Sequence, residues 1–217
     1  MNKFTKRLGL FGGRFDPVHK AHISVAVTAA NQLKLKEINW IVSGRPVQKK
    51  PVVSAFHRVK MVSIALRDLG DKRMRIDSRE VISSINGENN PTYKTIESIK
   101  RDYPDTELIW ILGHDQLLNF QSWLRWQWLI KNMKLAVCSR NPNNDHNSKN
   151  LIDDNFFRLI PKKRLIWIKI TPNDCSSTKI RKLISEDSSI LSYVNRNVRN
   201  YILENKLYKK IKEDGDL

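Results

Sequence analysis

Short apolar segments alternate with longer amphipathic ones along this chain, and no other feature of the sequence constrains its fold as strongly. The short segments are rich in β-branched and aromatic residues and are bounded by Gly, Asn, Ser or Pro, which is typical of buried strands. They are Arg7–Phe11, Ile38–Val42, Leu108–Leu112, Lys134–Cys138 and Leu165–Ile170. Their length and composition predict a strand in each.

The segments between these strands are predicted helices, because apolar residues recur in them at helical spacing. They are Ala21–Leu33, Ala55–Leu69, Thr92–Arg101, Gln116–Lys131, Thr178–Ser185 and Val198–Asn205. Helices that alternate with strands indicate βαβ units, and therefore an α/β fold with a doubly wound, mainly parallel sheet and helices on both faces. In such sheets ligands bind beyond the carboxyl ends of the strands, near the point where the strand order reverses.

Composition limits the class of protein. The chain has 217 residues, which predicts one compact domain over residues 1–217, and its 40% hydrophobic content with six Trp excludes a disordered chain. No apolar run approaches the roughly 18 to 20 residues that cross a bilayer, and the N-terminal segment lacks the apolar core of a signal peptide. Cys138 and Cys175 lie far apart and form no CxxC pattern. We therefore expect a cytoplasmic protein.

The formal net charge of +17 raises the question of nucleic-acid binding. The basic residues are scattered, and the clusters Lys49-Lys50 and 162–164 are short. This scattered pattern favours a general compositional bias toward Lys, Asn and Ile, together with the binding of small anionic substrates. The polar stretch Asn141–Asn155 is expected to be a surface loop. The sequence leaves open whether the chain forms a homo-oligomer.

The segment after the first strand, residues 12–22, reads GGRFDPVHKAH. Gly12 and Gly13 let the backbone turn sharply and approach a ligand closely. His19 and His22 are three residues apart, so a helix that starts here would place both imidazoles on nearly one face. A helix N-terminus beside a glycine turn is a natural phosphate site, and imidazoles can donate to phosphoryl oxygens. Taken separately, a Gly-Gly turn is ordinary, and an HxxH pair could be half of a zinc site.

This string resembles the GxFDPxHxGH signature of the nucleotidyltransferase superfamily, whose fold is a Rossmann-like sheet. The resemblance implies that His19 and His22 contact the phosphates of ATP, and that Gly12, Gly13 and Phe15 belong to the same ATP-binding loop. Ala21 stands where the family usually has Gly, and Arg14 where Thr or Ser is common.

A second segment far downstream, residues 175–181, reads CSSTKIR. Ser and Thr are preferred helix N-caps, and the free amides beyond them suit phosphate oxygens. Arg181, three residues after Thr178, would project near that N-terminus and can bind phosphate with both guanidinium nitrogens. The segment is similar to the superfamily's second signature, SSTxIR, and this likeness implies that Ser177, Thr178 and Arg181 bind ATP.

The middle of the chain is similar to bacterial nicotinate-nucleotide adenylyltransferases. Residues 113–130 resemble their GxDxL…W..W..I block, which implies that Gly113 and Asp115 hold the adenosine half of ATP and that Trp123 packs on the pyridine ring. Residues 43–49 occupy the place of an N-P-x-x-K loop, so Lys49 is implied to approach phosphate, with Lys50 as the alternative lysine.

Residues 90–98 resemble a sYTxDTL helix entry that holds the nicotinate carboxylate. An extra residue separates Tyr93 from Thr95 here, so either Thr92-Tyr93 or Thr95 could supply the donors. The segments 57–62 and 198–208 are similar to the family's hRxxM helix start and its V..YI…LY end.

The resemblance implies a reaction between ATP and nicotinate mononucleotide that gives deamido-NAD and pyrophosphate, in NAD biosynthesis. The 5′-phosphate is already an anion at pH 7, so positioning and charge stabilisation by His19, His22, Lys49 and Arg181 would supply the catalysis. Mg²⁺ would be held mainly by the nucleotide and water, and we expect no protein metal site. The alternatives are a related nucleotidyltransferase for nicotinamide mononucleotide, pantetheine phosphate or a polyol phosphate, a basic RNA-binding protein, and an HxxH metal-dependent hydrolase that lacks a third ligand.

Overall fold

A computed structural model of the chain describes residues 6–45, 51–139, 159–171 and 173–209. Its centre is a parallel sheet with the strand order β3-β2-β1-β4-β5-β6. The strands are β1 (Lys6–Gly13), β2 (Ile38–Val42), β3 (Met74–Asp77), β4 (Thr106–Gly113), β5 (Lys134–Ser139) and β6 (Leu165–Lys169). The strand order reverses between the neighbours β1 and β4, which makes the edge above them the expected place for a ligand.

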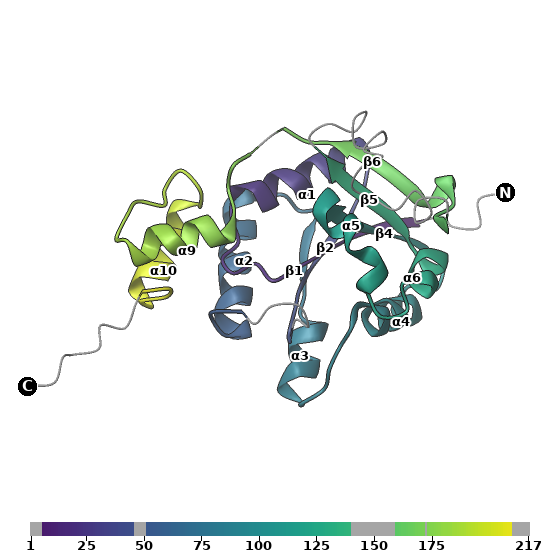
Figure 1. Ribbon diagram of the computed structural model, residues 1–217, viewed down its shortest axis with the longest axis horizontal. Helices are drawn as coiled ribbons and strands as arrows, with labels where there is room; N and C mark the ends of the chain where they lie inside the picture. Colours follow the sequence, from purple (N-terminus) through teal and green to yellow (C-terminus); the bar gives the residue numbers. More distant parts are fainter. Residues whose placement is uncertain (1–5, 46–50, 140–158, 172, 210–217) are drawn as a thin grey trace, which may run out of the picture.

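Two apolar clusters pack on the two faces of the sheet, so the prediction of a doubly wound α/β fold is confirmed. One face is covered by α1 (Lys20–Gln32), α2 (Ala55–Leu69), α9 (Ser177–Ser185) and α10 (Arg196–Glu204). The other is covered by α4 (Thr92–Asp102), α5 (His114–Leu118), η1 (Phe120–Ser122) and α6 (Trp126–Asn132). In Figure 1, α9 and α10 lie beside α2 at one side of the molecule, far from the edge strand β6.

The predicted strands and most helices agree with these bounds to within a few residues. The sequence analysis missed the short edge strand β3 and the helix α3 (Arg79–Ile85) that follows it. A turn of 3₁₀ helix, η2 (Lys162–Arg164), precedes β6. Within the described residues, no helix has both the length and the apolar character that crossing a membrane requires.

The prediction of one continuous helix over Gln116–Lys131 is wrong. The segment forms α5, η1 and α6, and Arg125 between the last two has left-handed backbone angles of φ 58° and ψ 39°. Polar side chains cap the broken turns: Asn119 donates to the carbonyl of Asp115, and the Ser122 hydroxyl donates to the carbonyl of Asn119. Such local bonds compete with a continuous helix. The break places Trp123 in a short extended link instead of a helix interior.

Candidate active site

The loop after β1 lies above the centre of the sheet, where glycines allow close packing. A Cβ on Gly12 would lie 2.3 Å from the indole of Trp110, and one on Gly13 would lie 2.9 Å from the ring of Phe15. Phe15 itself is buried and has a positive φ of 51°, which is unusual for a residue with a side chain. The loop is therefore fixed by contacts on both sides before α1 begins.

His19 and His22 come together at the start of α1. Their rings stack with centroids 3.6 Å apart, and the backbone amide of His19 donates to Nδ1 of His22 at 3.2 Å. His19 is buried, and its Nδ1 has no hydrogen-bond partner among the described residues. Burial lowers the pKa of His19 to about 4, and burial together with the neighbouring His19 lowers that of His22 well below its usual value. Both imidazoles are therefore neutral at pH 7 in the ligand-free protein.

The N-terminus of α9 packs directly against this loop. The Ser177 hydroxyl donates to the carbonyl of Pro17 at 2.9 Å. The Arg181 guanidinium donates to the carbonyl of Asp16 at 2.7 Å and to the hydroxyl of Thr178 at 3.2 Å. The structure therefore brings together the two signature segments, which are more than 150 residues apart in the sequence.

Asp16 shows how tightly the loop is held. Its side chain is buried and accepts the amide of Val52 at 2.7 Å and the hydroxyl of Tyr208 at 2.8 Å. One carboxylate therefore joins the loop after β1, the approach to α2 and the C-terminal part of the described chain. Both of its oxygens are used, so Asp16 serves the architecture of the loop.

Gly113 and Asp115 lie at the end of β4, next to β1. A Cβ on Gly113 would lie 2.5 Å from a carboxylate oxygen of Asp115, so a side chain there would displace the Asp115 carboxylate. Asp115 is exposed, and one of its oxygens accepts the amide of Gln116 at 3.1 Å. The pair lies at the reversal of strand order, where ligands of such sheets bind.

Trp123 and Tyr93 lie on the side of the site covered by α4 and α6. Trp123 packs edge-on against Trp110, with ring centroids 5.9 Å apart, and at a tilt against Phe120, with centroids 4.9 Å apart. Its indole nitrogen is buried without a partner among the described residues. The Arg125 guanidinium lies 4.5 Å from the centre of the Tyr93 ring. Since Trp110 also touches Gly12, this aromatic group borders the loop after β1.

The residues at the start of α4 differ in their exposure to solvent. Thr92 and Tyr93 are partly exposed at the first turn of α4. Thr95 is fully buried, and its hydroxyl donates to Glu80 at 2.7 Å. Burial raises the pKa of the Glu80 carboxyl to about 7, although the hydrogen bond from Thr95 acts to lower it. Lys49 and Lys50 lie outside the described residues.

Sequence reasoning missed the role of Arg58, which is fully buried beneath the site. One of its terminal nitrogens donates to the carbonyls of Arg14 at 2.9 Å and Ser43 at 2.7 Å, and the other donates to Gly44 at 3.3 Å. A signal was present: Arg58 shares the buried stripe of α2 with Met61, Val62 and Ala65, at helical spacing. An arginine on an apolar stripe indicates a buried hydrogen-bond network.

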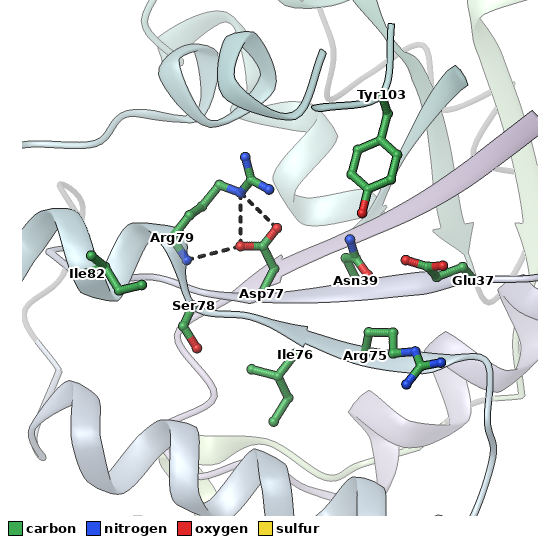
Figure 2. Close-up of a pocket in the computed structure, with 9 residues that line it drawn as sticks. All are labelled: Glu37, Asn39, Arg75, Ile76, Asp77, Ser78, Arg79, Ile82 and Tyr103. Carbon is green, nitrogen blue, oxygen red and sulfur yellow. Dashed lines mark hydrogen bonds and ion pairs between the residues drawn. The ribbon is translucent and has the colours of Figure 1, made fainter. Parts of the chain in front are cut away.

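A separate hollow lies away from these residues. It has a volume of about 420 Å³ and is lined by residues at the amino-terminal end of β2, along β3 and at the start of α3. Figure 2 shows Asn39, Arg75 and Tyr103 around it, with Arg79 paired to Asp77 at one side. None of the predicted site residues lines it.

Carboxylates do not gather at the site. Across the described ranges, no cluster of three or more His, Cys, Asp or Glu side chains could hold a metal ion. Both carboxylate oxygens of Asp16 already accept hydrogen bonds, from Val52 and Tyr208. This donor set fits a cation that arrives bound to nucleotide phosphates and keeps its water ligands.

Comparison with known proteins agrees with this geometry. The sequence family described as cytidylyltransferase-like matches residues 10–183. A protein of Bordetella petrii named probable nicotinate-nucleotide adenylyltransferase is 32% identical over 205 residues, which cover 94% of this chain and all of that protein. A protein of the same name from Wigglesworthia glossinidia brevipalpis is 32% identical over 92% of this chain and 96% of its own length.

Solved structures show the same fold. Nicotinic acid mononucleotide adenylyltransferase of Plasmodium falciparum, complexed with NaAD, superposes with a TM-score of 0.74 at 21% identity, over 94% of this chain and 97% of that one. Its complex with APC gives a TM-score of 0.73 at 22% identity, over the same shares of the two chains. With the sequence matches, these findings establish that the chain belongs to the cytidylyltransferase-like family and, within it, to the nicotinate-nucleotide adenylyltransferases.

Proposed function

We propose that this protein transfers the adenylyl group of ATP to nicotinate mononucleotide, giving deamido-NAD and pyrophosphate in NAD biosynthesis. One observation carries the proposal: Arg181 of the late signature donates to the carbonyl of Asp16, three residues before His19 of the early signature. Two anion-binding segments therefore meet where the strand order reverses. This arrangement suits a triphosphate that spans both.

The reaction is an in-line displacement at the α-phosphorus. An oxygen of the mononucleotide's 5′-phosphate forms the new bond, the bond to the β-phosphate oxygen breaks, and pyrophosphate leaves with its electron pair. The nucleophile needs no general base, so catalysis consists of orienting two polyanions and stabilising the charge at phosphorus. We assign this role to His19, His22, Lys49 and Arg181.

The neutral histidines suit this role. A triphosphate that approaches the exposed edge of the stacked pair favours their protonated forms, because an opposite charge raises the pKa of an imidazole. The two rings then become charge-assisted donors to phosphate oxygens. His19 offers Nδ1, which is buried and has no partner among the described residues.

We assign the remaining contacts by their place around the loop. The proposed ATP-binding residues are Gly12, Gly13, Phe15, His19, His22, Gly113, Asp115, Ser177, Thr178 and Arg181. The proposed mononucleotide-binding residues are Lys49, Thr92, Tyr93, Thr95 and Trp123. Thr95 has its hydroxyl bonded to Glu80, so it would act by fixing the first turn of α4.

Mg²⁺ is proposed to enter as part of the ATP substrate, where it neutralises phosphate charge during transfer. We also propose that residues 1–217 form one domain and that the reaction takes place in the cytoplasm. The C-terminal helices support the first point, because they share an apolar cluster with the sheet. Cys138 and Cys175, both free thiols, support the second.

The test is a pyrophosphate-release assay with Mg-ATP and a panel of phosphate acceptors. Nicotinate mononucleotide is expected to give the highest kcat/KM, above nicotinamide mononucleotide and pantetheine phosphate. A higher value with either of the other acceptors would reassign the substrate. Absence of pyrophosphate with every acceptor would reject the adenylyltransferase proposal for this chain.

A further inference from the structure

Arg58 is a buried cation whose hydrogen-bond partners in the described structure are all backbone carbonyls. Its side chain crosses from α2 to the turns that follow β1 and β2, and it donates to the carbonyls of Arg14, Ser43 and Gly44. The nearby carboxylates of Asp16 and Glu80 favour its charged form, while burial opposes it. A buried charge that spans two turns fixes their separation, because leaving any of its partners unpaired is costly.

The bond to Arg14 acts on the most strained point of the loop. The next residue, Phe15, has a left-handed φ of 51°, a conformation that persists when surrounding contacts enforce it. The Arg58 bond fixes the peptide plane that precedes Phe15. The ring of Phe15 in turn packs edge-on against His22, with centroids 5.0 Å apart.

The bonds to Ser43 and Gly44 hold the second turn against the first. The amide and the hydroxyl of Ser43 both donate to the carbonyl of Gly13, at 3.0 and 3.1 Å. Gly44 has no room for a side chain, since a Cβ would lie 2.1 Å from the backbone oxygen of Glu80. The two turns and the start of α3 are therefore packed around one guanidinium.

We propose that Arg58 is a positioning residue for adenylyl transfer, which fixes the turns after β1 and β2 relative to each other and, through Phe15, keeps the His22 imidazole in place beside the nucleotide. This inference rests on the proposed function. Arg58 acts through the backbone and does not touch substrate.

The test compares Arg58→Lys with two further variants. Lysine keeps the charge but cannot reproduce the planar fork that reaches three carbonyls. Gly44→Ala disturbs the same turn from the other side. Gly70→Ala is the matched control: it strains the C-terminus of α2 at a φ of 68°, in open space and away from the described site residues.

Arg58→Lys and Gly44→Ala are each expected to lower kcat/KM for ATP by about 100-fold, because a small misplacement of catalytic groups has that effect. The double variant should lose little beyond the worse single variant, since both changes release the same turn. Gly70→Ala should lower Tm yet keep kcat/KM within about twofold. A near-normal kcat/KM in Arg58→Lys would overturn the proposal. So would a Gly70→Ala enzyme that has the same Tm as Arg58→Lys and loses as much kcat/KM.

A second readout does not depend on turnover. Proton NMR titration of the histidines in the ligand-free protein should show His22 titrating at a higher pH in Arg58→Lys and Gly44→Ala than in the parent, because its ring becomes more exposed to water. Unchanged titration in both variants would contradict the link through Phe15. If Arg58→Lys does not fold, Gly44→Ala decides both readouts. If the parent protein is inactive, the proposed function is rejected. The histidine titration would still test whether Arg58 positions His22, because it does not depend on turnover.

Discussion

The stacked imidazoles at the start of α1 have a geometry that neutral rings tolerate better than charged ones. Two imidazolium ions with centroids 3.6 Å apart would repel each other. Burial adds to this effect and lowers the pKa of both rings. The ligand-free protein therefore holds both rings uncharged at pH 7.

Loss of one imidazole should abolish most turnover without unfolding the chain. His22→Ala is expected to reduce kcat by about 10²–10³, the usual effect of removing one donor to developing charge. Steady-state kinetics with circular dichroism as the fold control checks this. His57→Ala is the comparison, because His57 is bonded to Tyr201 on α10 and lies outside the stacked pair. Near-normal kcat in His22→Ala would remove this residue from the mechanism.

The depressed pKa of His19 also predicts how stability depends on pH. His19 binds fewer protons in the folded chain than in the unfolded one between pH 4 and 6.5, so the free energy of unfolding decreases as pH falls through that window. The contribution of His19 to the free energy of unfolding decreases by about 2 kcal/mol from pH 7 to pH 5. Urea unfolding of His19→Gln should therefore show weaker acid destabilisation than the parent. An identical pH dependence would contradict the low pKa.

Glu80 acts with the opposite sign and needs its own measurement. Its pKa rises from 4.5 to about 7 in the folded chain, so its contribution to stability is lost as pH increases through that range. The side chain of Glu80→Gln can still accept the Thr95 hydroxyl. The free energy of unfolding of this variant, relative to that of the parent, should therefore be higher at pH 8 than at pH 5. A constant stability difference across that range would mean that Glu80 titrates normally.

Among the elements, α9 has the most specific connection to the site. Its N-cap Ser176 accepts the amide of Lys179 at 3.2 Å, and its buried residues Ile180 and Ile184 join the apolar cluster of the sheet. Its first turns supply Ser177 and Arg181, the two residues bonded to the loop after β1. The helix is thus anchored by apolar packing, while its polar end completes the site.

Arg181→Lys should therefore impair the reaction far more than the fold. Lysine cannot bond the Asp16 carbonyl and the Thr178 hydroxyl while also reaching phosphate, so kcat/KM for ATP is expected to fall by about 10²-fold. Arg196→Lys, an exposed position on the neighbouring α10, should leave kcat/KM unchanged. Equal kinetic effects of the two substitutions would argue against a phosphate role for Arg181.

At the scale of the whole molecule, segments from both ends of the chain meet on Asp16. The bond from Tyr208 spans 192 positions in sequence, and both partners are buried. Burial raises the pKa of the Tyr208 hydroxyl, which therefore stays protonated and donates. The C-terminal part of the described chain thus stabilises the first loop directly.

Tyr208→Phe should lower the free energy of unfolding by about 1–3 kcal/mol, because it leaves a buried carboxylate oxygen unpaired. KM for ATP should rise as well, since Asp16 helps to fix the loop that binds phosphate. Tyr103→Phe, at an exposed tyrosine, is the control and should change neither quantity. Thermal unfolding and initial rates measure both, and an unaltered Tm for Tyr208→Phe would refute the role of this bond.

The alternation of strands and helices and the positions of both signature segments could be predicted from the sequence alone. These features are local: period, turn residues and capping residues lie within a few positions of each other. This locality explains why α2 agrees with its predicted bounds and why His19, His22 and Arg181 could be proposed as site residues from the sequence alone.

Other features of the fold and the site depend on contacts that form when the chain folds. The strand β3 is short and at the edge, and its pairing with β2 involves residues more than 30 positions apart. The burial of Arg58 and the partner of Tyr208 likewise depend on contacts between segments distant in sequence. The free energy of such contacts outweighs local propensity, so no window of sequence contains them.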